Sequence, residues 1–363
     1  MNLSNFKNSK VLITGHTGFK GTWLSMILLQ LGAKITGISN SIPSEPSFFE
    51  LSKIKNSIDH NFLNLINRDK LKEIIDNLNP DYIFHLAGQS LLTISYEDPI
   101  NTWQTNLTGT INMLESIRSL KKECVAVFIT SDKCYQNLER EEGYVETDTL
   151  GGIDPYSASK ASAEIAINSY VKSFFNLNNL QRIGVARAGN VIGGGDWAKN
   201  RIVPDCMRSW SQNHVVKIRN QQSTRPWQHV LEPLSGYLNL ALNLKHNSLL
   251  HGEAFNFGPP DKNNFSVGDL VDKMSLIWGS VRWQDNSINN NKLYESKLLK
   301  LNSNKAYDKL GWSCSMDFDY TLSQTVNWYK GYYDMKDSIN EITKNQIEDF
   351  FKNFKGHGLK WDQ

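Results

Sequence analysis

Short runs of consecutive apolar residues alternate along the first half of the chain with longer stretches whose apolar residues recur every three or four positions. Runs of the first kind predict buried parallel strands, and stretches of the second kind predict amphipathic helices. Strands that alternate with helices are typical of an α/β fold, in which helices cover both faces of a doubly wound parallel sheet. The runs that predict strands cover residues 10–14, 34–39, 62–65, 82–87, 124–129 and 182–188.

The regular alternation stops after residue 188. Helical spacing returns at 232–244, 267–278 and 320–333, and one further strand is predicted at 254–257. We therefore expect a first domain over residues 1–188 and a smaller, mixed α/β lobe over 189–340, with some segments of the lobe returning to the first domain. Residues 341–363 are charged, and we expect a peripheral helix with a loose tail there.

Composition and charge narrow the range of partners. The 363 residues are 40% hydrophobic and carry a formal net charge of +2, so no field is evident that would attract nucleic acid or a membrane surface. The longest apolar-rich stretch, near 23–31, is too short to span a bilayer, and the first ten residues do not resemble a signal peptide. We expect a cytoplasmic protein. The four cysteines are scattered without metal-ligand spacing, so we expect neither a disulfide nor a metal site.

A glycine-rich turn, G-H-T-G-F-K-G at 15–21, joins the first strand to the first helix. Strand, glycine turn and helix together form the context of a dinucleotide site in a Rossmann-type fold. Gly15 permits the tight turn, Gly18 lets backbone amides approach a pyrophosphate, and Gly21 allows the helix to pack closely on the sheet. An ordinary β–α turn remains the alternative, because three glycines alone are weak support.

Further cofactor contacts are expected where neighbouring strands end. The second strand ends in Ser39 without an acid or a nearby arginine, so the residues leave NAD and NADP open. Asn64 is placed to meet the adenine edge, whereas His85 lies inside an apolar strand and is better explained as a core histidine. The predicted cofactor contacts are Gly15, His16, Thr17, Gly18, Phe19, Lys20, Gly21, Ser39, Asn64, Leu65, Leu86, Ala87, Gly88, Gln89, Tyr156 and Lys160.

A tyrosine and a lysine stand four residues apart at the start of a predicted helix. Asp154 is a suitable N-cap and Pro155 a suitable first helical residue, so Tyr156 and Lys160 share one helix face. An ammonium about 4 Å away would lower the pKa of a phenol from about 10 by roughly two to three units. Tyr156 would then serve as a proton acceptor. A surface tyrosine on an amphipathic helix is the alternative.

Polar residues follow the strand at 124–129. In an open parallel sheet the carboxyl ends of the strands face the ligand crevice, so Ser131, Asp132 and Lys133 would be delivered to that crevice. A salt bridge between Asp132 and Lys133 that merely ends the strand is the alternative. The predicted catalytic residues are Ser131, Asp132, Lys133, Tyr156 and Lys160.

Three arginines follow the glycine-rich bend at 189–197. Arginines can bind a diphosphate with bidentate geometry, although any one of these three is also explained as a solvated surface residue. The predicted substrate contacts are Ser90, Ser131, Asn190, Trp197, Arg201, Arg219, Arg225 and His229.

Five motifs, taken in chain order, resemble those of the extended short-chain dehydrogenase/reductase family, and within it those of bacterial CDP-glucose 4,6-dehydratases. They are G-H-T-G-F-K-G at 15–21, T-S-D-K-C-Y at 130–135, L-G-G-I-D-P-Y-S-A-S-K at 150–160, R-A-G-N-V-I-G-G-G-D-W at 187–197 and R-P-W-Q-H-V-L-E-P at 225–233. The resemblance implies bound NAD, a homodimer built on two helices of each subunit or a dimer of dimers, and a C-terminal lobe that binds a sugar nucleotide. Asn64 stands where this family usually carries an aspartate.

The resemblance also implies a reaction, in which CDP-D-glucose becomes CDP-4-dehydro-6-deoxy-D-glucose as part of bacterial deoxysugar and surface-polysaccharide (O-antigen) synthesis. C4 is oxidised, water is eliminated across C5 and C6, and hydride returns to C6. Tyr156, aided by Ser131 and Lys160, would accept the proton of the 4-hydroxyl. Asp132 would act as the acid for the departing 6-hydroxyl, and Lys133 as the base at C5.

Three other functions use parts of the same residue set. A 4,6-dehydratase of another nucleotide sugar would share the Asp132 and Lys133 pair. A nucleotide-sugar 4-epimerase would need Ser131, Tyr156 and Lys160 but no acid and base at C5 and C6. A non-catalytic dinucleotide sensor would be expected to lose part of that triad, which this chain keeps whole.

Overall fold

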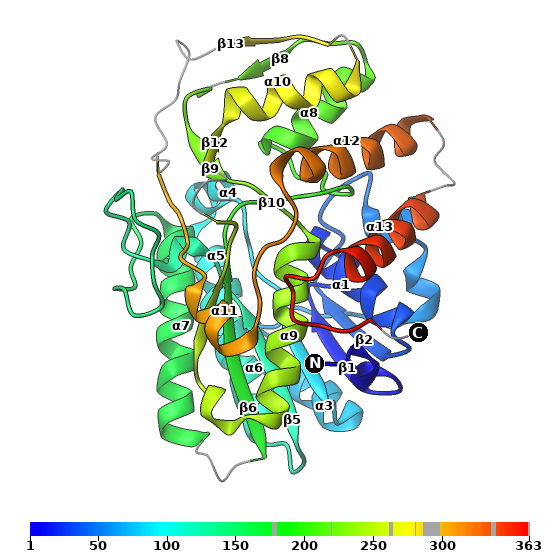
Figure 1. The fold of residues 1–363 in the computed structure, drawn as a ribbon. Helices are drawn as coiled ribbons and strands as arrows, with labels where there is room; N and C mark the ends of the chain where they lie inside the picture. The colour runs from blue at the N-terminus through cyan, green and yellow to red at the C-terminus, as the bar shows by residue number, and fades with distance from the viewer. Residues whose placement is uncertain are drawn as a thin grey trace.

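A seven-stranded parallel sheet forms the centre of the molecule (Figure 1). The computed structural model describes residues 1–175, 180–218, 220–260, 264–279, 281–285, 298–334 and 339–361. The strand order is β11-β6-β5-β4-β1-β2-β3, so the chain winds outward in both directions from β1 and the predicted doubly wound α/β fold is confirmed. The strands are β1 (Lys10–Thr14), β2 (Lys34–Ser39), β3 (Asp59–Phe62), β4 (Tyr82–His85), β5 (Cys124–Ile129), β6 (Gln181–Ala188) and β11 (Ala254–Phe257).

One strand lies three residues away from its predicted position. The apolar run at 62–65 predicted the third strand, but β3 covers the polar stretch Asp59–Phe62 and pairs with β2 through Ser39 opposite Phe62. β3 is an edge strand, so burial of both faces is not required of it. Leu65 follows the strand and packs into the core, which explains why its apolar character was misleading.

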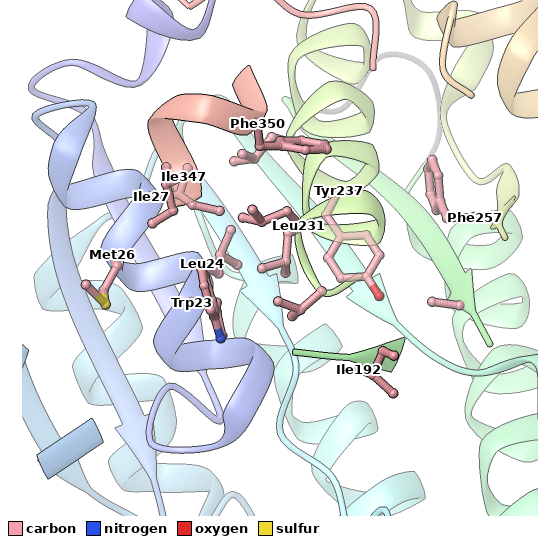
Figure 2. Packing of buried hydrophobic residues seen from close by; sticks show 14 of the residues in the cluster. Trp23, Leu24, Met26, Ile27, Ile192, Leu231, Tyr237, Phe257, Ile347 and Phe350 are labelled. Carbon is pink, nitrogen blue, oxygen red and sulfur yellow. The ribbon is translucent and has the colours of Figure 1, made fainter. Parts of the chain in front are cut away.

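Helices cover both faces of the sheet and form two separate apolar clusters (Figure 1). On one face lie α1 (Phe19–Gln30), α9 (Leu231–His246) and α13 (Ile339–Asn353), whose buried side chains interlock in Figure 2. On the other face lie α3 (Arg68–Leu78), α6 (Gly109–Arg118) and α7 (Pro155–Phe174). The short helices α2 (Phe48–Leu51), α4 (Leu92–Glu97) and α5 (Pro99–Trp103) lie in the connections.

Side chains cap the first turns of two of these helices, and the cap by Asp154 was predicted. The side chain of Asn67 accepts from the Lys70 amide at the start of α3, and Asp154 accepts from the Ser157 amide at the start of α7. The helical stretch that runs from α5 into α6 is not uniform, because a π-helical turn, Gln104–Thr108, separates the two helices. Such a turn often marks a functional site.

Most of the chain after β6 builds a smaller layer above one end of the sheet (Figure 1). It contains α8 (Ile202–Ser211), α10 (Val267–Trp278) and α12 (Phe318–Asp334), while α11 (Asn304–Leu310) lies against β11 and α9. Its strands pair two by two: β7 (Val191–Ile192) with β10 (Gln228–His229), β9 (Thr224–Pro226) with β12 (Asn264–Ser266), and β8 (Val216–Ile218) with β13 (Trp283–Asp285).

The C-terminal segment is held more firmly than the loose tail that we expected. Ile347 and Phe350 of α13 are buried against the first domain. Beyond the helix, Lys360 forms a parallel bridge with Asn2, and the Met1 amine donates to the carbonyl oxygen of Gly358. Both ends of the chain therefore stabilise each other.

Among the helices of the described residues, none combines the length and the apolarity that a membrane crossing requires. All four cysteines are free thiols.

Candidate active site

The glycine turn between β1 and α1 packs against the end of β4. Gly15 has φ +76°, a left-handed conformation that favours glycine, and a Cβ added there would lie 2.8 Å from the Ala87 amide nitrogen. A Cβ added at Gly21 would lie 2.1 Å from the carbonyl oxygen of Gly15. Both glycines are thus required for the tight turn and the close helix packing that the sequence predicted. The predicted contacts Leu86, Ala87 and Gly88 directly follow β4 at this turn.

The first turn of α1 fits a diphosphate. Gly18 is the N-cap, and as a glycine it has no side chain that could accept a hydrogen bond from the first amides of this helix. These amides carry the positive end of the helix dipole and can donate to an anion. The residues of the turn, including Thr17 and Phe19, therefore fit the pyrophosphate of a dinucleotide cofactor.

The end of β2 forms a small polar network with the same turn. The Ser39 hydroxyl lies 3.0 Å from His16 Nδ1 and accepts from the Thr17 amide at 3.3 Å. His16 Nε2 lies 2.7 Å from His60 Nδ1. Burial and then the nearby His60 lower the pKa of His16 to about 4, so this ring is neutral at physiological pH.

Asn64, the predicted adenine contact, and its neighbour Leu65 differ in exposure to solvent. Asn64 is exposed, and its side-chain oxygen accepts from the Ile66 amide in its own turn. Leu65, predicted beside it, is buried in the apolar cluster beneath. Contact of Asn64 with adenine stays a prediction.

Ser131 and Asp132 share a short helical turn directly after β5. The Ser131 side chain accepts from the Lys133 amide at 3.2 Å and donates to Asp132 Oδ1 at 2.8 Å. Asp132 is 3% exposed, and burial, which outweighs the opposing effects of Lys133 and Ser131, raises the pKa of its carboxyl. Lys133 is half-buried. Asp132 therefore faces inward, as a proton donor of the site must.

Tyr156 lies beside Ser131, as the resemblance to the family implied. Burial is the main cause that raises the pKa of Tyr156 to about 12, while a hydrogen bond with Ser131 lowers it. The net direction is opposite to the one that we expected from Lys160. The reason is the burial of the phenol, which is the largest cause of its shift. Lys160 is buried too, and burial lowers its own pKa to about 8.

A residue that the sequence did not single out supports this arrangement. Asn106 lies in the π-helical turn, is 2% exposed, and accepts from the Gln89 amide at 2.9 Å. Its Nδ2 donates to the Ser159 hydroxyl at 2.9 Å, so it ties the segment after β4 to α7. A Cβ added at Gly88 would lie 3.0 Å from both Asn106 Oδ1 and Lys160 Nζ. The signal that could identify Asn106 is the π-helical turn that carries it, and the hydrophobic pattern of the sequence does not reveal that turn.

Two of the three predicted arginines lie at the site. Arg201 pairs with Asp196 at 2.9 Å, donates to the Ser90 hydroxyl at 3.2 Å, and lowers the pKa of Tyr156. Arg225 is 8% exposed and lowers the pKa of Asp132. Arg219 lies outside the described residues.

The remaining predicted substrate contacts are Trp197, His229 and Asn190, and their contact with a substrate stays a prediction. Trp197 is enclosed by an aromatic cluster that includes Trp328 and Tyr332. His229 is fully buried edge-on against Trp23. We propose packing roles for both rings, since neither side chain reaches an open surface. Asn190 accepts from the Gln228 amide through its carbonyl oxygen at 3.2 Å, which aligns β7 with β10.

Comparison with known proteins places these features in a family. The family described as GDP-mannose 4,6 dehydratase matches residues 12–325. CDP-glucose 4,6-dehydratase of Salmonella typhimurium is 41% identical over 350 residues, which cover 95% of this chain and 97% of that protein. UDP-glucose 4-epimerase of Mycoplasma pneumoniae is 24% identical over 336 residues, which cover 90% of this chain and 98% of the relative.

Solved structures of similar fold include a dTDP-glucose 4,6-dehydratase from Bacillus anthracis in complex with NAD. It has a TM-score of 0.73 and 21% identity, and the match covers 89% of this chain and 96% of that one. A UDP-glucuronic acid 4-epimerase from Bacillus cereus, in complex with UDP-glucuronic acid and NAD, has a TM-score of 0.77 at 21% identity, over 89% of this chain and all of the other. The chain belongs to the GDP-mannose 4,6-dehydratase family of extended short-chain dehydrogenases/reductases.

Proposed function

We propose that this protein is an NAD-dependent CDP-glucose 4,6-dehydratase, which converts CDP-D-glucose into CDP-4-dehydro-6-deoxy-D-glucose. The observation that carries the proposal is the position of Asp132, a buried carboxyl with a raised pKa that is hydrogen-bonded to Ser131 beside Tyr156. Burial favours the protonated form of this carboxyl, and a proton donor beside the bound sugar is what the loss of water requires. The nucleotide is inferred from the Salmonella relative, which is 41% identical over nearly the whole chain.

The first step needs a base for the 4-hydroxyl of the sugar. Tyr156 is the acceptor, and its hydrogen-bond partner Ser131 holds the same hydroxyl in place. Lys160 stabilises the phenolate. When bound, NAD would accept a hydride and return it, and its oxidised ring would add a positive charge to the site. The turn at 15–21 would hold its diphosphate.

The second step removes water from the 4-keto sugar. The C5 proton is acidic once C4 is a ketone, and we assign Lys133 as the base that takes it. The C5 electron pair forms the C5–C6 double bond as the C6–O bond breaks, and the Asp132 proton converts the departing hydroxyl into water.

The geometry favours elimination over epimerisation. Epimerisation at C4 needs the Tyr156, Ser131 and Lys160 set alone, and a buried proton donor beside Ser131 would have no task in that reaction. The 24% identity with UDP-glucose 4-epimerases is accounted for by the shared fold and the shared first step.

Further properties are proposed on the same basis. Residues 1–188 would bind NAD and carry the catalytic residues, and 189–340 would mainly bind the sugar nucleotide, with Arg201 and Arg225 near its diphosphate. The protein would act in the cytoplasm as a homodimer or a dimer of dimers, supplying a 4-keto-6-deoxy sugar for surface-polysaccharide synthesis.

Incubation with CDP-, UDP-, GDP- and dTDP-glucose in separate reactions tests the substrate assignment. Mass spectrometry should detect loss of one water from CDP-glucose, with far slower turnover of the other three. Preferred dehydration of another nucleotide would refute the CDP assignment, and conversion without loss of mass would favour an epimerase.

A further inference from the structure

Lys20 lies in the first turn of α1, but its side chain reaches across to α9. Its Nζ donates to the Tyr237 hydroxyl at 3.4 Å and lies 6.0 Å from the centroid of the same ring. A hydroxyl oxygen and an aromatic ring both stabilise an ammonium. The sequence motif had suggested a cofactor contact for this lysine, whereas in the structure its ammonium contacts Tyr237 of α9.

Packing of the neighbouring residues fixes this direction. The Trp23 indole donates to the carbonyl oxygen of Gly194 at 2.8 Å, one turn further along α1. A Cβ added at Gly193 would lie 3.3 Å from the ring of Phe19. The first turns of α1 are thus held against the glycine-rich bend after β6, and Lys20 is carried on the same part of the helix.

Tyr237 connects Lys20 to the reaction centre. The ring is fully buried in the apolar cluster, and Figure 2 shows its hydroxyl directed away from Phe350, toward the side of the cluster where Ile192 lies. Burial raises the pKa of this phenol, and the proximity of Tyr156 raises it further. Tyr237 therefore stays protonated, so it is a fixed polar partner rather than a second base.

Lys20 also interacts with the charges of the site. The pKa of Lys20 is lowered to about 8, mainly by burial and then by Arg201 and Lys160, while Asp132 opposes this change. The reverse effect is present too, because Lys20 lowers the pKa of Asp132. At neutral pH most of the Lys20 population is charged, and Asp132 is the carboxyl on which this charge acts.

We propose that Lys20 is a positioning residue for the elimination step, and that its ammonium, held by Tyr237, stabilises the Asp132 carboxylate formed when Asp132 protonates the departing 6-hydroxyl. This inference rests on the proposed dehydration. The C5 proton moves to Lys133, the C5–C6 double bond forms as the C6–O bond breaks, and the Asp132 proton leaves with the oxygen as water. Asp132 is left with a negative charge, which Lys20 balances without exchanging a proton.

Lys20→Met tests the proposal, with Lys20→Arg as the conservative variant and the exposed Lys34→Met as the control. Loss of one preorganised charge commonly costs about 10²-fold in rate, so we expect Lys20→Met to slow water loss by roughly that factor. Its dissociation constant for NAD should stay within about twofold of wild type, which also reports correct folding. Quenching with borodeuteride should trap more of the 4-keto sugar that still carries its 6-hydroxyl. Lys20→Arg, which keeps the charge, should recover most of the rate.

The outcomes separate the two levels of inference. If Lys20→Met mainly weakens NAD binding and regains its rate at saturating NAD, Lys20 is a cofactor ligand and the proposal is overturned. Wild-type rates in both Lys20 variants would overturn it as well, while the dehydratase assignment stands. If the wild-type protein removes no water from CDP-glucose, the proposed function fails and this inference fails with it.

Discussion

At the scale of single residues, the site depends on the protonation of Asp132. Burial raises the pKa of its carboxyl, and Ser131 donates a hydrogen bond to it at 2.8 Å. Lys133, the next residue, is half-buried and has a flexible stem. In the proposed reaction, this inward acid and this adjacent amine would supply the two functions that removal of water requires, from a single turn at the end of β5.

Substitution of Lys133 separates these functions. Lys133→Met should bind NAD normally but lose water from the substrate roughly 10²- to 10⁴-fold more slowly, because general base catalysis typically contributes that much. Cofactor binding is measured by fluorescence and water loss by mass spectrometry. The control Lys34→Met removes an exposed lysine and should leave both unchanged. Normal dehydration by Lys133→Met would show that Lys133 is not the base.

At the scale of elements, the turn between β1 and α1 limits what the cofactor site tolerates. Gly15 and Gly32 both have φ +76°, so alanine is strained equally at either position. Only at Gly15 does the added Cβ meet the backbone, since at Gly32 the nearest atom is a Lys7 side-chain carbon at 3.4 Å.

This pair provides a matched test of the turn. We expect Gly32→Ala to lose about 1 kcal/mol of stability and to keep its NAD affinity. Gly15→Ala should weaken NAD binding more than about tenfold, because the end of β4 must move away from the turn. Titration of NAD into both variants measures the difference. Equal NAD affinities would mean that the turn does not form the cofactor site.

A second element, the start of α9, links the two lobes through Glu232. Its Oε1 accepts from the amides of Ser315 and Met316, and burial raises the pKa of its carboxyl to about 7 from 4.5. A raised carboxyl pKa means that the folded protein holds a proton that the unfolded chain releases. Stability from this group is therefore greatest below about pH 4.5 and declines as the pH rises to about 7.

Glu232→Gln should remove that part of the pH dependence. Each pKa unit corresponds to about 1.4 kcal/mol, so a shift of about 2.5 units amounts to about 3 kcal/mol at most. Urea unfolding of both proteins at about pH 5 and about pH 8 measures this. The wild type should lose stability relative to the variant at the higher pH. An equal change in the free energy of unfolding of both proteins between the two pH values would show that Glu232 does not cause this pH dependence.

Most of the strands and helices could be predicted from the sequence, and each wrong prediction has a physical cause. β1, β2, β5 and β11 have the predicted bounds because consecutive apolar residues specify a buried strand. β3 was misplaced because an edge strand does not need apolar residues. The position of Asn106 depends on a π-helical turn, which hydrophobic periodicity does not reveal. The pKa direction of Tyr156 was wrong because spacing indicates which charge is near, but not how deeply both groups are buried.

At the scale of the whole molecule, the C-terminal helix closes the core. Phe350 of α13 is fully buried and contacts Phe351 and His357, and the cluster continues through Leu231 of α9 to Trp23 of α1 (Figure 2). The charged composition of this segment concealed its apolar face, so the sequence led us to expect a loose end.

Truncation of the Phe350 side chain measures how much the packing of α13 contributes to the stability of the protein. Phe350→Ala should lower the free energy of unfolding by about 3–5 kcal/mol, through lost burial and the cavity left behind. Leu276, 81% exposed on α10, provides the control, and Leu276→Ala should change stability by less than about 0.5 kcal/mol. Chemical unfolding followed by tryptophan fluorescence compares them. Equal effects would show that α13 is peripheral after all.

The central claim is that one site oxidises C4, removes water across C5 and C6, and returns the same hydrogen to C6. CDP-glucose labelled with deuterium at C4 tests it most directly, with the product read by NMR and mass spectrometry. The account predicts a product that has lost one water and carries the deuterium at C6. A product of unchanged mass that keeps deuterium on an inverted C4, or a dehydrated product without the label, would contradict it.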